Sequence, residues 1–316
     1  MFFAKAISVI KMKRSIKGSI AISGASSGIG EACAIYLDQL GYQVFAGVRN
    51  KVDGETLKRK TLDRVIPIIF DVTDRMSIEM AVETIQPLLN VHGLTGLINN
   101  AGIVTTGPLE FLPIDELRKQ LEVNVLGQIS VTQAFLPLLR KSEGRIINIG
   151  SDYGRVSGPL LGPYCASKFA MEALTDALRM ELKPWAIDVS IIEIGTVRTP
   201  IWNKSIDQLN KIWEKFPEQA KQLYSPIFEA VKETARKLEK NGLSTDAVAK
   251  VIALAIIEEK PKNRYIVGLD AKTNILLSKI LPSKFLDNLV MWYLGIPKNA
   301  SITGEQSYIT GQISND

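Results

Sequence analysis

Cysteine and histidine are scarce in this sequence: its 316 residues include two cysteines, Cys33 and Cys165, and one histidine, His92. Two thiols without paired spacing cannot build a disulfide framework, and without histidine partners they do not form a zinc site. His92 precedes a predicted strand, away from the motifs described below, which argues against a Ser–His–Asp triad around them. We therefore expect no metal site and a reduced, cytoplasmic setting.

Long apolar runs and blocks of one charge are also missing. No stretch reaches the roughly 18 to 20 unbroken apolar residues of a membrane-spanning helix. Residues 1–17 lack the apolar run and cleavage site of a signal peptide, so we predict a solvated lead-in, with attraction to an anionic membrane surface as the weaker alternative. The net charge of +5 is spread along the chain without basic blocks interleaved with aromatics, which argues against nucleic-acid binding.

Short β-branched runs alternate with longer segments of helical period, and the apolar fraction of 46% suits a globular core. This alternation predicts a doubly wound α/β fold, with a seven-stranded, mainly parallel sheet and helices on both faces. The predicted strands are residues 19–23, 42–48, 65–70, 94–99, 145–150, 188–193 and 265–267. Gly41 is predicted to end the helix between the first two strands.

The pattern predicts one domain over residues 18–270, with an insertion at about 200–241. A structureless connection of that length would be unusual, so we expect a helical lid, after which a helix begins at Ser244 or Thr245. Five aromatic residues of the insertion could line a pocket for an apolar ligand or pack the lid itself, and the sequence leaves both open. They are Trp202, Trp213, Phe216, Tyr224 and Phe228.

The C-terminal part divides into an apolar extension, residues 271–297, and a polar tail, residues 298–316. Pro282 splits the apolar residues into two segments, each too short to cross a bilayer. Such segments could cover a pocket, form a subunit interface or rest on a membrane surface through residues 274–297. Covering the pocket or forming an interface is favoured over membrane contact.

A glycine-rich loop follows the first predicted strand and opens a helix: Ser23-Gly24-Ala25-Ser26-Ser27-Gly28-Ile29-Gly30. Glycines permit a tight turn and close backbone approach, while a helix N-terminus presents unpaired N–H groups to a phosphate. Strand, loop and helix occur in the order of a dinucleotide-binding unit. We therefore predict a dinucleotide site at the carboxyl edge of the sheet.

Tyr164 and Lys168 lie four residues apart on a segment of helical period, so they share one face. A phenol has a pKa of about 10, and a nearby ammonium favours its anion. This pair is therefore suited to proton transfer with an alcohol or a carbonyl. Cys33 and Cys165 are predicted to pack in the core rather than to react.

These motifs and others resemble the short-chain dehydrogenase/reductase family, in order along residues 18–270. The matching elements are the Gly24-xxx-Gly28-x-Gly30 loop, Asp71, Asn99-Asn100-Ala101-Gly102, Asn124, Ser151 and Tyr164-xxx-Lys168. The resemblance implies a Rossmann fold and an NAD(P)-dependent oxidoreductase that interconverts a ketone or aldehyde and an alcohol. One departure is Ile194-Gly195, where the family usually has Pro-Gly, so the following loop lacks the rigid ring.

The resemblance also implies the site residues. Ser151 would hydrogen-bond the substrate oxygen, Tyr164 would act as general acid/base beside Lys168, and Asn124 would hold a water in the proton path. The implied cofactor-binding residues are Gly24, Ser26, Ser27, Gly28, Ile29, Gly30, Arg49, Asp71, Val72, Asn100, Ala101, Gly102, Tyr164, Lys168, Gly195, Val197 and Thr199.

The end of the second predicted strand favours NADP(H) over NAD(H). An acidic residue there would bind a free ribose 2′-OH, whereas a cation would accommodate a 2′-phosphate. The sequence has Arg49 at this place and no carboxylate before Asp53, although Asp53 could fold back.

The lid and extension resemble those of family members that act on steroids, retinoids and similar lipids, which implies a small hydrophobic substrate. The family also implies a homo-oligomer, a dimer or a tetramer. Two rival functions remain: a sugar-nucleotide epimerase or dehydratase, and a non-catalytic NADP(H)-sensing protein, which would typically have lost the tyrosine or the lysine.

Overall fold

The computed structural model describes residues 18–89 and 93–296. The predicted lead-in at 1–17, His92 and the tail at 298–316 lie outside the described residues.

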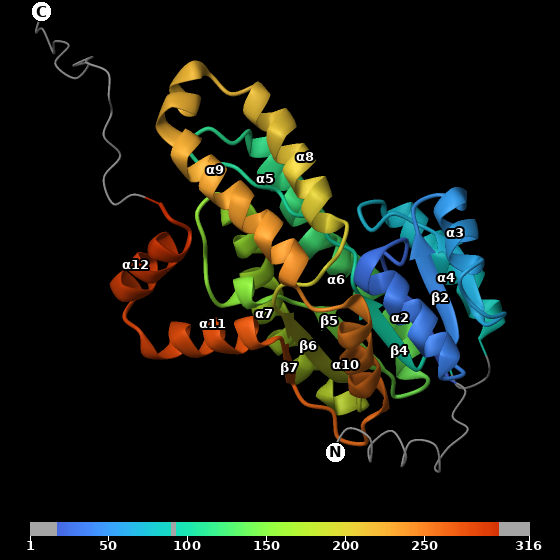
Figure 1. Cartoon of the computed structure of the whole chain (residues 1–316). Coiled ribbons are helices and arrows are strands. Elements are labelled where there is room, and N and C mark those ends of the chain that lie inside the picture. The colour runs from blue at the N-terminus through green and yellow to red at the C-terminus, as the bar shows by residue number, and fades with distance from the viewer. Residues whose placement is uncertain (1–17, 90–92, 297–316) are drawn as a thin grey trace, which may run out of the picture.

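A seven-stranded sheet forms the centre of the fold (Figure 1). Its strands are β1 (Ser19–Ile22), β2 (Gln43–Val48), β3 (Val65–Ile69), β4 (Gly96–Asn99), β5 (Arg145–Ile149), β6 (Asp188–Ile194) and β7 (Arg264–Val267). The order is β3-β2-β1-β4-β5-β6-β7 and every pairing is parallel. The predicted doubly wound α/β fold is therefore confirmed, with every predicted strand present.

Helices cover both faces of the sheet. They are α2 (Gly28–Gln39), α3 (Lys51–Lys58), α4 (Arg75–Ile85), α5 (Ile114–Leu121), α6 (Gly127–Arg140), α7 (Gly162–Leu182) and α10 (Thr245–Ile257), with short turns η1 (Gln86–Leu88), η2 (Glu122–Leu126), η3 (Asp152–Gly154) and η4 (Lys183–Trp185). In β1, Ile20 and Ile22 pack with α2 and α10, whereas Ala21 packs with α4 and α6. This alternation explains why the buried strands read as continuous apolar runs.

Local signals set the helix ends as the sequence predicted. Gly41 adopts a left-handed φ of 93° just after α2, a conformation that glycine allows without strain. Ser244 caps α10, because its hydroxyl accepts the Ala247 N–H at 3.2 Å.

The insertion forms two helices, α8 (Ile201–Glu214) and α9 (Glu218–Asn241), which lie side by side at one end of the sheet (Figure 1). Four of the five aromatics pack the lid or its neighbours: Trp213 stacks on Phe228 at 4.0 Å, Phe216 meets Trp213 edge-on, and Tyr224 meets Phe111. Of the five, Trp202 lines the cavity described below. Of the two roles that the sequence left open for these aromatics, four residues pack the lid and Trp202 lines the cavity.

The apolar extension forms α11 (Leu269–Ile280) and α12 (Ser283–Tyr293), separated at Pro282 as predicted. Figure 1 shows both helices beyond the β7 edge of the sheet. Among the described residues, no helix is long and apolar enough to cross a membrane.

Candidate active site

A cavity of about 1040 Å³ extends from the carboxyl edge of the sheet to the lid and the C-terminal helices. Its place follows from the topology, because β1 lies between β2 and β4 and the chain reverses direction across the sheet there. Of the predicted site residues, all except Gly30 line it. They are Gly24, Ser26, Ser27, Gly28, Ile29, Arg49, Asp71, Val72, Asn100, Ala101, Gly102, Asn124, Ser151, Tyr164, Lys168, Gly195, Val197 and Thr199.

The glycine loop is held tightly against the end of β4. Gly24 has a φ of 67°, and a Cβ on it would lie 2.7 Å from the Ala101 Cα. Asn100 clamps the loop, since its Nδ2 donates to the carbonyls of Ser23 at 3.0 Å and Gly24 at 2.9 Å. A Cβ on Gly30 would collide with the Gly24 carbonyl, so Gly30 serves the close packing of α2 on the loop.

The N-terminus of α2 has the features of a phosphate site. Its cap residue, Ser27, makes no side-chain capping bond, whereas Asp74 caps α4 and Asn50 caps α3. The first backbone N–H groups of α2 thus lack a side-chain acceptor, and Ser27, Gly28 and Ile29 line the cavity. A pyrophosphate supplies the negative charge that such an end favours, so these residues fit a dinucleotide.

The end of β2 presents a cation to the cavity and no carboxylate. Arg49 is exposed and lines the cavity. Asp53 does not line it: Asn50 Nδ2 donates to the Asp53 carboxylate at 2.9 Å, and the Asp53 N–H donates back to Asn50 at 2.9 Å. The carboxylate that could have folded back is therefore occupied at the start of α3.

Tyr164 and Lys168 face the same cavity from the first turns of α7. The Lys168 Nζ lies 5.6 Å from the centre of the Tyr164 ring and donates to the Ile149 carbonyl at 2.7 Å. The phenol and the ammonium group are therefore neighbours in the cavity that the glycine loop also lines.

Burial shifts the pKa of both groups. Loss of solvation lowers the pKa of Lys168 to about 8, and the Glu172 carboxylate opposes this shift. Burial raises the pKa of the Tyr164 phenol above its ordinary value, and a hydrogen bond with Ser151 acts in the opposite direction. At neutral pH the site therefore holds a protonated phenol beside an ammonium group.

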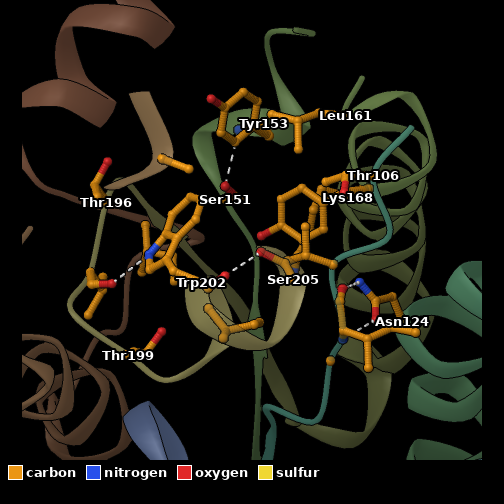
Figure 2. A pocket seen from close by; sticks show the side chains of 18 of the residues that line it. Thr106, Asn124, Ser151, Tyr153, Leu161, Lys168, Thr196, Thr199, Trp202 and Ser205 are labelled. Atoms are coloured by element: carbon orange, nitrogen blue, oxygen red, sulfur yellow. Dashed lines mark hydrogen bonds between the residues drawn. The ribbon is translucent and has the colours of Figure 1, made fainter. Parts of the chain in front are cut away.

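Ser151 follows β5 directly and begins the turn η3. Its Oγ accepts the Tyr153 N–H at 3.2 Å (Figure 2). Its hydroxyl donates to the Asp152 carboxylate at 3.0 Å. The turn fixes the hydroxyl in the cavity near Tyr164.

Asn124 lies in η2, a π-helical turn between α5 and α6. Its amide oxygen accepts the Ile103 N–H at 2.8 Å, while its Nδ2 donates to the Ile103 carbonyl at 3.0 Å and to Ser167 at 3.2 Å. Single π turns occur often at functional sites. The sequence did not predict this turn.

The loop after β6 is held by Asp270, which the sequence did not predict as functional, and by Trp202, whose role the sequence left open. Asp270 of α11 accepts the Thr196 N–H at 2.6 Å, which fixes the loop although Ile194 replaces the family's proline. The Trp202 indole donates to the Val197 carbonyl at 2.9 Å. Figure 2 shows Trp202 on the same side of the pocket as Thr196 and Thr199.

The C-terminal helices complete the cavity. Asn274 of α11 donates to the Asp152 carboxylate at 2.8 Å, and burial raises the pKa of Asp152. Further cavity-lining residues of this segment are mostly apolar: Leu277, Leu286, Leu289, Val290, Trp292, Tyr293 and Leu294.

The Rossmann-type sheet, the uncapped glycine loop and the Tyr–Lys pair at one cavity define a dinucleotide-dependent oxidoreductase. Residues 19–210 match the family described as "short chain dehydrogenase". The chain therefore belongs to the short-chain dehydrogenase family, in the branch that contains the retinol dehydrogenases, and is an NAD(P)-dependent oxidoreductase.

Several relatives match over most of their length. The NADPH-dependent 3-dehydrocapnine reductase of Ornithobacterium rhinotracheale is 36% identical over 274 residues, 85% of this chain and 94% of that protein. Retinol dehydrogenase 7 of Rattus norvegicus is 38% identical over 276 residues, 86% and 87% of the two chains. Among solved structures, a short-chain dehydrogenase from Streptomyces avermitilis is 26% identical with a TM-score of 0.70, covering 89% of this chain and 97% of that one.

Proposed function

We propose that the protein is an NADP(H)-dependent reductase that converts a ketone or aldehyde on a hydrophobic molecule to the alcohol, with alcohol oxidation as the reverse reaction. The observation that carries this proposal is the placement of Tyr164 and Lys168, one helical turn apart, in a cavity bounded by the glycine loop and by an apolar lid.

Four side chains would perform the proton chemistry. When bound, the nicotinamide supplies the hydride. The Ser151 hydroxyl, which donates to Asp152 in this structure, would turn to donate to the substrate oxygen, and the Tyr164 phenol would donate the proton that this oxygen needs. The Lys168 ammonium stabilises the phenolate that results, and Asn124 holds a water through which the proton is replaced.

Burial raises the pKa of Tyr164 further above neutral pH, so the phenol is in the protonated form that reduction requires. Arg49 at the end of β2 and the occupied Asp53 support NADP(H) as the cofactor. The relative named an NADPH-dependent reductase supports the same choice.

The substrate class is inferred from the walls of the cavity. The lid and the C-terminal helices contribute mostly apolar side chains, among them Trp202, Leu209, Leu277 and Val290. The cavity of about 1040 Å³ would hold the dinucleotide and the substrate together, because the glycine loop and the lid both line it. Relatives named for retinol and for 3-dehydrocapnine support a steroid, a retinoid or another lipid-like substrate.

The outer surface of α11 and α12 supports a further part of the proposal, contact with a membrane surface. Large apolar side chains are exposed on these helices, with Lys272, Lys279 and Lys284 nearby. The exposed side chains are Leu269, Leu276, Ile280, Phe285, Leu289, Trp292 and Tyr293. Apolar groups flanked by lysines suit the interface of an anionic bilayer, from which a hydrophobic substrate could enter. The homo-oligomer and the cytoplasmic setting stay predictions.

The test is turnover of NADPH with panels of steroid, retinoid, fatty-aldehyde and sugar-nucleotide substrates. We expect reduction of a carbonyl in one of the first three panels, and Tyr164→Phe to abolish it while retaining the fold and NADPH binding. Near-normal turnover by the phenylalanine variant would refute the proposed role of Tyr164. Activity confined to sugar nucleotides would favour the epimerase or dehydratase, and NADPH binding without turnover would favour the sensor.

A further inference from the structure

A cluster of charged side chains around two buried glutamates joins α7, β6, β7 and the segment after η3. The Arg155 guanidinium donates to the Glu172 carboxylate at 2.7 Å and to the Glu193 carboxylate at 2.9 Å. Arg264 of β7 donates to Glu172 at 3.1 Å and to Asp176 at 2.7 Å. The side chains of Glu172 and Glu193 are buried, with 7% and 1% exposed. Neither carboxylate is among the four side chains to which the proposed proton chemistry assigns a direct step.

The cluster joins the segments that carry the proposed active site. Arg155 follows η3, the turn that begins at Ser151. Glu172 lies on α7 one turn after Lys168, and Glu193 is near the end of β6, just before the loop at Thr196. A buried charge left without its partner is costly, so these contacts fix where the three segments lie.

The turn η3 packs against α7 at two points of this helix. A Cβ added to Gly154 would lie 3.1 Å from the Glu172 Cγ and 3.1 Å from the Lys168 carbonyl. The side chains of Lys168 and Glu172 are both buried and four residues apart, the spacing at which helical side chains are neighbours. One Glu172 oxygen, Oε1, has no hydrogen-bond partner among the described residues.

We propose that Arg155 and Glu172 are positioning residues for the proposed reaction: Arg155 fixes the Ser151 turn on α7, and Glu172 supplies the negative charge that faces Lys168. This inference rests on the proposed function of Tyr164 and Lys168. The groups facing Glu172 are Arg155, Arg264, Glu193 and Lys168; Asp176, further along α7, is itself paired with Arg179 at 3.0 Å.

The charges predict how Lys168 responds to a change at Glu172. Burial and the neighbouring Glu193 carboxylate raise the pKa of Glu172 to about 7, so its negative charge is fully present above that pH, where Lys168 titrates. Burial favours the neutral Lys168 amine, and the Glu172 carboxylate favours the ammonium. Removing the carboxylate charge while keeping its shape should therefore make Lys168 release its proton at lower pH. A purely structural role of Glu172 would leave the midpoint of this titration unchanged.

The experiment compares Glu172→Gln with Glu181→Gln, a matched change at an exposed position of the same helix. The Lys168 proton is followed by NMR in protein labelled at the lysine Cε carbons, with Lys168→Met to assign the signal, and kcat for carbonyl reduction is measured across pH. In Glu172→Gln we expect the lysine midpoint and the alkaline limb of kcat to fall together by about 1 pH unit. In Glu181→Gln we expect neither to move.

Two further variants separate charge from geometry. Glu172→Asp keeps the charge but shortens the reach to Arg155, so kcat should fall while the lysine midpoint stays. Arg155→Lys should also lower kcat with NADPH affinity retained.

A wild-type lysine midpoint in Glu172→Gln would overturn the proposed role of Glu172. Should that variant not fold, wild-type kcat in both folded Glu172→Asp and folded Arg155→Lys would overturn the inference, and reduced kcat in both would support it. The NMR titration needs no turnover, so it stays informative even where the proposed reduction fails.

Discussion

Asn274 and Asp152 are hydrogen-bonded to each other at 2.8 Å, although 122 residues separate them in the sequence. Asp152 is also the hydrogen-bond acceptor of the Ser151 hydroxyl at 3.0 Å. Two hydrogen bonds thus connect the C-terminal helix α11 with the serine that is proposed to bind the substrate oxygen. Four residues before Asn274, Asp270 holds the loop at Thr196. The apolar extension is therefore part of the framework of the site.

Asn274→Leu is expected to impair both stability and activity. The substitution leaves a buried carboxylate of Asp152 without one of its donors, which costs about 1–3 kcal/mol. We expect the free energy of unfolding in urea to fall by that amount and kcat to fall about tenfold. Ser278→Ala on the same helix, which removes only a bond to the Ile275 carbonyl, is the control. Equal free energies of unfolding and equal kcat values in the two variants would contradict the proposed link between α11 and Ser151.

Reduction is expected to slow as the pH rises through about 8. Lys168 is charged below its pKa of about 8 and neutral above it, and only the ammonium stabilises the Tyr164 phenolate. The measurement is kcat for carbonyl reduction from about pH 6 to about pH 10. In Lys168→Arg the guanidinium stays charged over this range, so the alkaline limb should move upward even if kcat is lower overall. A limb that stays in place would assign the titration to another group.

Arg49→Ala is expected to weaken NADPH binding about tenfold, which corresponds to about 1.4 kcal/mol, and to leave NADH binding nearly unchanged. The physical reason is the lost partner for a 2′-phosphate. Binding is measured by the fluorescence of the reduced cofactors. Lys51→Ala is the matched control, because Lys51 is an exposed cation two residues away that does not line the cavity. Unchanged NADPH affinity in Arg49→Ala would refute the role of Arg49 as the partner of the 2′-phosphate.

The sheet could be predicted from the sequence because its determinants are local. Each buried strand is a short apolar run, and Gly41 and Ser244 mark helix ends through their own backbone or side-chain preferences. The Tyr164–Lys168 pair was predictable for the same reason, since a spacing of four on a helix fixes which side chains are neighbours.

Contacts between distant segments could not be predicted in this way. Asn274 and Asp270 act on Asp152 and Thr196 through tertiary packing, and no periodicity in the sequence relates these positions. The π turn at Asn124 interrupts a segment whose composition is ordinary for an α-helix. The division of the lid aromatics also depends on packing, because Trp202 and Trp213 lie near opposite ends of α8 and meet different neighbours there.

Trp202→Leu is expected to change mainly KM, whereas Phe228→Ala is expected to change mainly the free energy of unfolding. Trp202 lines the cavity and donates one hydrogen bond to the Val197 carbonyl, so its loss should raise KM for a hydrophobic substrate and lower the free energy of unfolding by only about 1 kcal/mol. Phe228 is buried against Trp213, so its truncation should lower the free energy of unfolding by about 3–5 kcal/mol. Unfolding in urea and steady-state kinetics measure the two effects. A similar loss of stability in both variants would place Trp202 in the packing of the lid.

The exposed apolar face of α11 and α12 is expected to bind lipid vesicles. Leu276, Ile280 and Phe285 are exposed and do not line the cavity, so changing all three to Glu should abolish flotation with anionic vesicles without closing the pocket. A triple glutamate variant of Val52, Met76 and Met80 on α3 and α4 is the matched control, since these side chains are equally exposed on helices that belong to another part of the molecule. It should float like the unchanged protein. The membrane proposal fails if the unchanged protein does not float, and a dimer that dissociates in the α11–α12 variant would assign this face to a subunit interface.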